Sequence, residues 1–212
     1  MQARKINNKG RARIFKNGLL EALTRTRPWV IYAIYIPLNI FMILYVLIEF
    51  QYSAVTIVPI FLIAMASWTF FEYLVHRFLF HYHATTGFAK RLVYVFHENH
   101  HEFPRDRERL FMPPVPSILL AALVFSVFGL ISYMLSGTIG YAMIFFPGFI
   151  TGYLIYVSMH YAIHAYAPPK YLKMLWRNHH LHHYKYPDKA FGVSSMFWDK
   201  LFDTLPDKDK SN

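Results

Sequence analysis

Long apolar stretches alternate with short polar ones along this chain of 212 residues. No Asp, Glu, Lys or Arg occurs in the 21 residues from Pro28 to Ile48, in the 22 from Phe50 to Phe71, or in the 60 from Leu110 to Pro169. A helix needs about 20 mostly apolar residues to cross a bilayer. The pattern therefore predicts a membrane protein built from spanning helices.

We expect four membrane-spanning helices, paired as two hairpins. Their expected ranges are 28–50, 54–80, 115–135 and 138–160, and the second is free of charge only as far as Phe71. Only residues 51–53 separate the first two helices, and Ser136 and Gly137 separate the last two. Because each gap has room for no more than a tight turn, the helices of each pair run antiparallel.

The basic residues lie outside the apolar stretches and predict the orientation of the chain. Of the 22 Lys and Arg residues, residues 1–27 hold eight, residues 77–109 hold six and residues 166–212 hold eight. An even number of spans puts these three segments on one face of the membrane. The excess of basic residues in short loops assigns that face to the cytoplasm.

This placement predicts an all-α integral membrane protein with a cytosolic, histidine-rich helical cap. We expect a basic N-terminal tail, residues 1–27, and a membrane domain, residues 28–212, whose cap consists of residues 81–114 and 161–212. The net charge of +10 indicates attraction to anionic lipid headgroups. No nucleic-acid partner is expected, because the basic residues flank the spans and form no single patch.

Ten of the twelve histidines form four short clusters on this same face. The clusters are His76 and His81; His97, His100 and His101; His160 and His164; and His179, His182 and His183. A lone histidine at a membrane interface is more often a hydrogen-bonding group than a ligand, but four clusters on one face favour metal binding. Neutral imidazole suits iron, zinc, copper and nickel. Since one ion rarely takes more than about six ligands, ten imidazoles indicate two metal ions close together.

Spacing within the clusters supports ligation. The histidines of the second and fourth clusters lie at positions i, i+3 and i+4, and those of the third at i and i+4, so each set shares one helix face. His76 and His81 differ, because five residues leave them roughly 140° apart on an ideal helix. We expect the helix to distort or end near Phe78–Phe80, or the two residues to bind different metals.

Some residues near the clusters are candidates for supporting roles. Glu72, Glu98 and Glu102 are expected to accept the outer N–H of a ligating imidazole. The alternative for Glu98 and Glu102 is a solvated charged face shared with residues 105–109. His83 and His180 fall outside the repeated spacings and are expected to be bystanders or to support the ligands from outside.

Two other segments carry a local signal. Three prolines, at 113, 114 and 116, break any helix before the third span and are expected to hold residues 103–112 against the site, unless they only start the helix. In Phe191–Leu205 the large apolar residues fall at helical spacing. This favours an amphipathic helix at the membrane interface or a helix packed against the cap.

Six stretches of this sequence resemble the fatty acid hydroxylase superfamily, most closely the fatty acid (sphingolipid) 2-hydroxylases. They are HRFLFH at 76–81, HENHH at 97–101, RLFMPPVP at 109–116, HYAIH at 160–164, HHLHHYK at 179–185 and FGVSSMFWDKLFDTL at 191–205. The resemblance implies that the ten histidines hold a dinuclear centre, expected to contain iron, although zinc can occupy such sites in isolated protein. It also implies O2-dependent hydroxylation next to the carbonyl of an acyl chain, expected to be that of a ceramide or related membrane lipid.

The sequence departs from the better-known members of that family in two places. Those members carry an N-terminal cytochrome b5 domain, whereas residues 1–27 lack its haem-binding pattern. Electrons are therefore expected from a separate cytochrome b5- or ferredoxin-like protein and its reductase, and a bacterial inner membrane is favoured over the endoplasmic reticulum. The family has an acidic residue three positions before His160, where this chain has Val157.

Two other functions are compatible with the sequence. The first is oxidation of a C–H bond in a sterol or carotenoid by another member of the superfamily. The second is a membrane metal-binding or transport protein without enzymatic activity. Transport is disfavoured because the histidines gather at one face and the spans carry almost no polar path.

Overall fold

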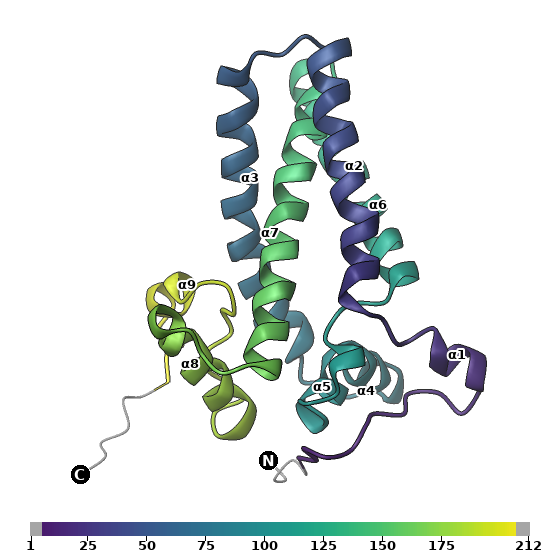
Figure 1. The fold of residues 1–212 in the computed structure, drawn as a ribbon, viewed down its shortest axis with the longest axis vertical. Coiled ribbons are helices and arrows are strands. Elements are labelled where there is room, and N and C mark those ends of the chain that lie inside the picture. The colour runs from purple at the N-terminus through teal and green to yellow at the C-terminus, as the bar shows by residue number, and fades with distance from the viewer. Residues whose placement is uncertain (1–5, 207–212) are drawn as a thin grey trace.

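The computed structural model describes residues 6–206, which form helices and loops with no strand among them. Four long helices stand side by side, and the short helices gather at one end of them (Figure 1). The long helices are α2 (Pro28–Glu49), α3 (Ala54–Leu74), α6 (Pro114–Ser136) and α7 (Gly140–Ala165). All four are long and apolar enough to cross a membrane, which confirms the predicted hairpins to within a few residues.

The short elements make up the remainder of the described fold. They are α1 (Gly18–Ala22), η1 (Val75–Phe80), α4 (Gly87–Val93), η2 (Tyr94–Glu98), α5 (Asn99–Glu102), η3 (Arg107–Arg109), η4 (Lys170–Leu172), α8 (Lys173–Tyr184) and α9 (Phe197–Leu201). Of these, η1 and η2 are π-helices, whose hydrogen bonds run from residue i+5 back to residue i. We call the short helices and loops at this end the cap.

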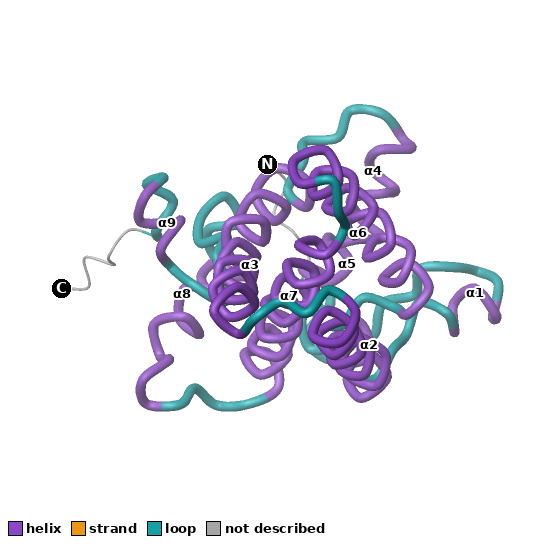
Figure 2. The backbone as a smooth tube through the Cα atoms, turned by 90° about the horizontal axis from the view of Figure 1, so that it is seen from above, coloured by secondary structure: helices purple, strands orange, loops and turns teal. Residues whose placement is uncertain are grey.

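Helix α7 is the centre of the bundle. It packs against α2, α3 and α6, and the view from above shows it between α2 and α3 (Figure 2). In its most apolar window 67% of the residues are buried, against 11–22% for the other three helices. Gly148 and Gly152 allow α3 to approach closely, since a Cβ atom at these positions would lie 2.3 Å from the Phe61 carbonyl oxygen and 2.4 Å from the Trp68 Cβ.

Tight turns join the helices of each hairpin, as the short gaps predict. Gln51 has a φ of 52° in the first turn, and Gly137 has a φ of 72° in the second. Glycine adopts this left-handed conformation without steric cost. The Gly137 amide donates to the Tyr133 carbonyl at 2.8 Å and so ends α6.

The loop before α6 lies against the bundle. Helix α6 begins at Pro114, so the prolines end the preceding loop as expected. Phe111 is 1% exposed and makes edge-to-face contacts with Tyr32 of α2 and Tyr161 of α7. Tyr35 and Ser117 share a hydrogen bond of 2.6 Å that ties α2 to α6.

The C-terminal apolar segment packs against α3. Helix α9 has only five residues, too few for an extended amphipathic helix. The Trp198 ring lies 4.5 Å from the ring of Phe70, and its indole N–H donates to Thr69 at 2.9 Å. Packing against the body of the protein therefore describes this segment better than an interfacial helix.

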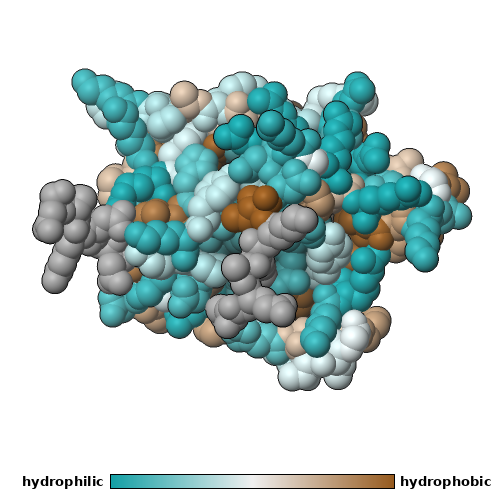
Figure 3. Space-filling view, turned by 90° about the horizontal axis from the view of Figure 1, so that it is seen from below, coloured by the Kyte–Doolittle hydropathy of each residue, from teal (hydrophilic) through white to brown (hydrophobic). Residues whose placement is uncertain are grey.

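The N-terminal residues lie against the cap. Ala12, Ile14 and Glu21 are all buried, and the Thr26 amide donates to the Glu108 carbonyl at 2.9 Å. The division between residues 1–27 and 28–212 stays a prediction, and residues 1–5 lie outside the described part. Seen from below, the end of the molecule that carries the cap is mostly hydrophilic (Figure 3).

Candidate metal centre

The structure brings together all ten histidines singled out in the sequence. They form two groups of five at the cap end of the bundle, and within each group the candidate ligand atoms lie within 4.8 Å of one another. Group one is His76, His81, His97, His101 and His182; group two is His100, His160, His164, His179 and His183. The two groups adjoin, since the rings of His101 and His183 stack at 4.1 Å.

A π-helix brings His76 and His81 to the same side of the chain, although they are five residues apart. His76 is the second residue of η1 and His81 directly follows its last residue, and the His81 amide donates to the His76 carbonyl at 3.2 Å. A π-helix needs more residues per turn than an α-helix, so positions i and i+5 come to the same side. The predicted distortion near Phe78–Phe80 is confirmed, and both histidines belong to group one.

Each of the two three-histidine clusters contributes to both groups. In α5 and η2, His97 and His101 belong to group one and His100 to group two. In α8 the division is reversed, since His179 and His183 belong to group two and His182 to group one. Positions i and i+4 lie about 40° apart on a helix, whereas i+3 and i+4 lie about 100° apart. One helix face is therefore broad enough to serve two neighbouring centres.

The spacing of the ring nitrogens matches that of ligands around an ion. Neighbouring Nε2 atoms lie 3.1 Å apart for His76 and His97, 2.9 Å for His97 and His101, 3.2 Å for His101 and His182, 2.9 Å for His100 and His160, 2.9 Å for His164 and His179, and 3.1 Å for His179 and His183. Metal–nitrogen bonds of about 2.1 Å put adjacent ligands about 3.0 Å apart around a five- or six-coordinate ion, and about 3.4 Å apart around a tetrahedral ion. The observed spacing fits the higher coordination number.

The protonation of the rings also suits metal binding. Burial lowers the pKa of His97, His100 and His179 well below the usual range of imidazole, so these rings are neutral near pH 7. The Nδ1 atoms of His76 and His182 lie 2.6 Å from the Phe191 carbonyl oxygen and 2.7 Å from that of Lys189. An N–H donated outward leaves the lone pair of Nε2 facing the other rings.

Lone pairs that converge at about 3 Å repel one another unless a cation lies between them. The donor set holds nitrogen alone, without carboxylate or thiolate, which favours a borderline transition metal over calcium or magnesium. The two histidine groups could therefore hold metal ions, one in each group.

Two buried carboxylates hold the loop that carries these carbonyl partners. Asp199 is 1% exposed and accepts hydrogen bonds from the Phe191 amide at 2.9 Å and the Gly192 amide at 2.8 Å. Glu72 accepts from the Val193 amide at 2.5 Å and from the amide and hydroxyl of Ser194. The expectation that Glu72 accepts from an imidazole is wrong. It supports the loop that orients His76 and His182, a contact that no local sequence pattern indicates.

The other predicted supporting residues have mixed outcomes. Glu102 accepts a hydrogen bond of 3.2 Å from the Tyr94 hydroxyl rather than from a ligating imidazole. A fully solvated charged face is also wrong, because the side chains of Asp106 and Arg109 are 5% and 4% exposed. His83 and His180 belong to neither group, as expected, although the His180 ring lies 6.3 Å from that of His164.

A largely apolar cavity of about 440 Å³ adjoins both groups. His97 of group one and His100 and His160 of group two line it. The remaining walls come from α2, α3, η1, η2, α5, α6, α7, the residues 109–113 that lead into α6, and the N-terminal segment. Along α7 the lining runs from Phe149 to His160, so the cavity extends roughly 15 Å from the histidines into the bundle.

Val157 belongs to this cavity wall. It is 2% exposed and lies one helical turn before His160 on the same face of α7. The structure therefore places an apolar side chain beside the histidines at the position where the resemblance led us to expect a carboxylate.

Comparison with known proteins gives a consistent family. The sequence model of the fatty acid hydroxylase family matches residues 61–204. The dihydroceramide fatty acyl 2-hydroxylase FAH1 of Arabidopsis thaliana is 33% identical over 95% of this chain and 83% of its own length. The fatty acid 2-hydroxylase of Mus musculus is 33% identical over 91% of this chain, and the match spans 56% of the mouse protein.

A solved structure also resembles this fold. It is described as full-length scs7p with only the hydroxylase domain visible, and it superimposes with a TM-score of 0.84 at 31% sequence identity. The match covers 95% of this chain and 74% of that chain. The likeness thus extends over the long helices and the cap together.

Proposed function

Since this chain belongs to the fatty acid hydroxylase family, we propose that it hydroxylates a fatty acyl chain at the carbon next to the carbonyl group. The acyl chain is that of a ceramide or a related membrane lipid. The names of the relatives from Arabidopsis and mouse support the position of the new hydroxyl group. The observation that carries the proposal is a lipid-sized cavity whose wall includes histidines of both groups.

We further propose that the ten histidines are the ligands of two metal ions, expected to be iron. Their convergent Nε2 atoms and the spacing of about 3 Å support this assignment. Such a pair of ions, when bound, supplies the redox chemistry that O2 needs to attack an unactivated C–H bond. Burial lowers the pKa of His97, His100 and His179 and so keeps these imidazoles neutral near pH 7. The carbonyl groups of Phe191 and Lys189 orient the rings of His76 and His182.

The cavity supports a defined pose for the lipid. Its deep part, between Trp68 of α3, Val124 of α6 and Phe149 of α7, is apolar and suits the tail of the acyl chain. The carbon next to the carbonyl then lies at the histidine end. Burial of the tail among apolar side chains excludes water and fixes which carbon approaches the site.

The stoichiometry of the reaction requires an electron donor. One acyl C–H bond, one O2 molecule, two electrons and two protons give one hydroxyl group and one water molecule. We propose that a separate cytochrome b5- or ferredoxin-like protein, reduced by its own reductase, delivers the two electrons.

The proposed orientation puts the cap and the described ends of the chain in the cytoplasm. The clustering of Lys and Arg at this end supports it, because neither hairpin turn carries a basic residue. A bacterial inner membrane as the location stays a prediction. Cysteine reporters at Gln51 and Asn8, labelled from either side of sealed vesicles, test the orientation, and labelling of Gln51 from the cytoplasmic side would refute it.

Mass spectrometry of lipid extracts tests the proposed reaction. Cells that make the protein, a suitable reductase system and isotopically labelled O2 should form lipids with one labelled oxygen atom in the acyl fragment, next to the carbonyl. Cells that make the His182→Ala variant serve as the matched control and should form none. Oxidation of a sterol or carotenoid with untouched acyl chains would refute the proposal, as would metal-loaded protein that forms no product.

A further inference from the structure

Part of the cavity wall comes from outside the spanning helices and the histidine cap. The N-terminal segment contributes Ile14, Phe15, Leu20, Leu23 and Thr24 to the lining. Helix α1 of this segment lies beside the lower ends of the long helices, outside the bundle (Figure 1). The segment therefore adds a wall at the end of the cavity where the bundle meets the cap.

This wall contains the place where the cavity reaches the surface. Leu20 and Leu23 line the cavity and are 47% and 54% exposed, and Phe96 of η2, also in the lining, is 50% exposed. Side chains that face both the cavity and the outside mark its mouth. Val115 and Leu120 of α6 also line the cavity and are 60% and 43% exposed. The rim of the mouth is thus apolar and combines α1 with η2 and the first part of α6.

The mouth lies at the level where the chain enters the bilayer. Trp29, in the first turn of α2, is 63% exposed and is typical of an aromatic residue at the membrane interface. Leu19 of α1 is 72% exposed. An apolar rim at this level suits a lipid that enters sideways, because a polar ligand from water would meet no hydrogen-bonding partner there.

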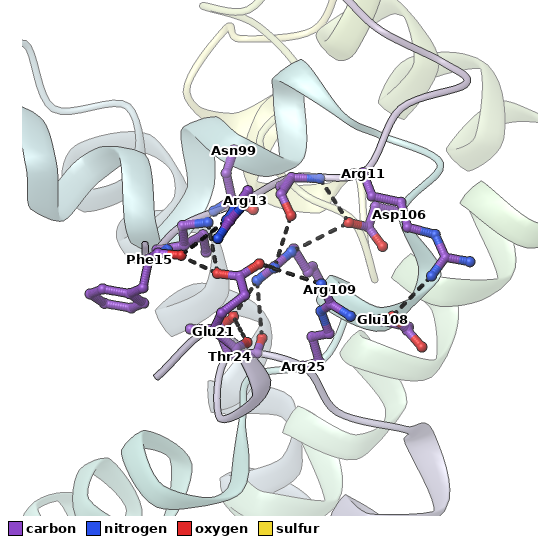
Figure 4. Close-up of polar contacts among 12 residues, drawn as sticks. Arg11, Arg13, Phe15, Glu21, Thr24, Arg25, Asn99, Asp106, Glu108 and Arg109 are labelled. Carbon is purple, nitrogen blue, oxygen red and sulfur yellow. Dashed lines mark hydrogen bonds and ion pairs between the residues drawn. The ribbon is translucent and has the colours of Figure 1, made fainter. Parts of the chain in front are cut away.

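A buried network of charges fixes the segment to the cap. The guanidinium group of Arg109 donates to the Glu21 carboxylate, to the Thr24 hydroxyl at 2.5 Å and to the Ala12 carbonyl at 2.9 Å (Figure 4). Asp106 lies 3.3 Å from the same guanidinium group and accepts from the Ala12 amide at 3.0 Å.

Glu21 completes this network from within α1. It is 6% exposed and accepts hydrogen bonds of 2.9 Å from the amides of both Ile14 and Phe15. The carboxylate therefore holds two residues of the cavity wall directly and is paired with Arg109 on the cap. One network sets the distance between α1 and the loop that leads into α6.

We propose that the segment Ile14–Thr24 is a specificity-determining wall of the substrate cavity, in which Leu20 and Leu23 contact the lipid at the mouth. The Glu21–Arg109 pair positions this wall. The inference rests on the proposed hydroxylase function, because that function supplies the lipid. It assigns to α1 a part in selecting the substrate, in addition to its place in the fold.

Thiol accessibility tests the contact without depending on turnover. The chain has no cysteine, so single variants Leu20→Cys, Leu23→Cys and Leu19→Cys each carry one reporter. Leu19 is the matched control, since it belongs to the same helix but lies outside the cavity lining of the described residues. Each variant is reacted with a maleimide in phosphatidylcholine nanodiscs with and without palmitoyl ceramide.

We expect ceramide to slow the reaction severalfold at Leu20→Cys and Leu23→Cys and to leave Leu19→Cys unchanged. Equal rates with and without ceramide at all three positions would overturn the inference. Protection at Leu19→Cys equal to that at Leu20→Cys would also overturn it, since the lipid would then cover α1 without entering the mouth.

Substitution by tryptophan tests whether the contact selects substrates. We expect Leu20→Trp to raise KM severalfold for ceramides and to change the ranking of palmitoyl against behenoyl substrates, with unchanged metal content. Leu19→Trp should leave both the KM for ceramides and the ranking of the two substrates unchanged. If wild-type protein hydroxylates ceramide but Leu20→Trp has an unaltered KM and ranking, the wall assignment is wrong. If wild-type protein forms no product while ceramide still protects Leu20→Cys, the proposed function fails and the binding site remains.

Discussion

The two groups of histidines use different supports. Group two takes four of its five residues from the continuous helices α7 and α8, as two pairs at i and i+4. Group one draws on two π-helices and on the loop of residues 189–194, whose carbonyl groups lie against His76 and His182. Regular helix geometry thus forms one site, and distorted helices with a carboxylate-anchored loop form the other. Substitutions of residues that are not ligands should therefore weaken metal binding at group one more readily than at group two.

The largest expected effect comes from His182→Ala. This residue reaches group one from α8, the helix that also carries two residues of group two. We expect the variant to lose the ion of group one and all turnover, because five imidazoles would be reduced to four. Metal analysis of the purified variant checks this, and an undiminished content of two ions per chain would contradict the assignment.

His180→Ala is the matched control on the same helix. His180 is partly exposed and belongs to neither group. We expect nearly normal metal content and activity after this change. Loss of a metal ion would show that its position near His164 serves ligation.

A smaller effect is expected from Asp199→Asn. Asparagine keeps one accepting oxygen and replaces the other by an NH2 group, so one of the hydrogen bonds from Phe191 and Gly192 is lost and the loop beside group one should loosen. We expect about 10–100-fold weaker metal binding at group one, the usual result when the support of a ligating histidine is lost. Release of metal to a chelator, followed over time, should show one fast and one unchanged phase. Asp203→Asn is the control, because Asp203 is exposed and its φ of 53° suits asparagine. Equal acceleration of both phases would contradict the difference between the groups.

Glu72 offers a still finer test of the same loop. Its Oε1 accepts from two amides and its Oε2 from the Ser194 hydroxyl, which can reverse its hydrogen bond. We therefore expect Glu72→Gln to retain metal at both groups, whereas Glu72→Ala should release it from group one. Chelator kinetics distinguish the two variants. Loss of metal in Glu72→Gln would mean that the negative charge itself is required.

The smallest effect on either group is expected from Glu21→Gln. Burial alone would raise the pKa of Glu21, but hydrogen bonds from Phe15 and Ile14 and the charge of Arg109 lower it below 4.5. The contribution of the ionised Glu21 carboxylate to the free energy of unfolding is therefore complete above pH 4.5. It is lost as the pH falls through the lowered pKa. We expect Glu21→Gln to lower the free energy of unfolding by about 1–3 kcal/mol at neutral pH.

Thermal unfolding of the wild-type protein and the Glu21→Gln variant across a range of pH checks this prediction. The difference in stability should shrink as the pH falls below 4.5, while metal content near pH 7 stays the same. A difference that is independent of pH would show that the charge of Glu21 contributes nothing.

The parts of the fold and site that could be predicted from the sequence are those marked by a local pattern of residues along the chain. Charge-free stretches located the four spans, and the Lys and Arg pattern gathered the polar segments at one end. The repeated HxxHH spacing and the edges of the spans identified all ten histidines that the structure brings together. The wide angle between His76 and His81 predicted either a helix distortion or ligation of different metals, and the structure shows the distortion.

The remaining features depend on contacts between distant segments. Nothing in the sequence shows that His182 belongs to group one and His183 to group two. This assignment depends on how α8 faces α5 and η1. Glu72 meets Val193 across 121 positions, and Arg109 meets Glu21 across 88. Glu21 resembles any charged residue in a basic tail until the fold buries it. Such pairings carry no local pattern, so only the three-dimensional structure reveals them.

Anomalous X-ray scattering from crystals of the metal-loaded protein tests the central claim most directly. We expect two peaks per chain, one inside each group of five histidines and each about 2.1 Å from the ring nitrogens around it. A single peak, or peaks outside the two groups, would contradict the account.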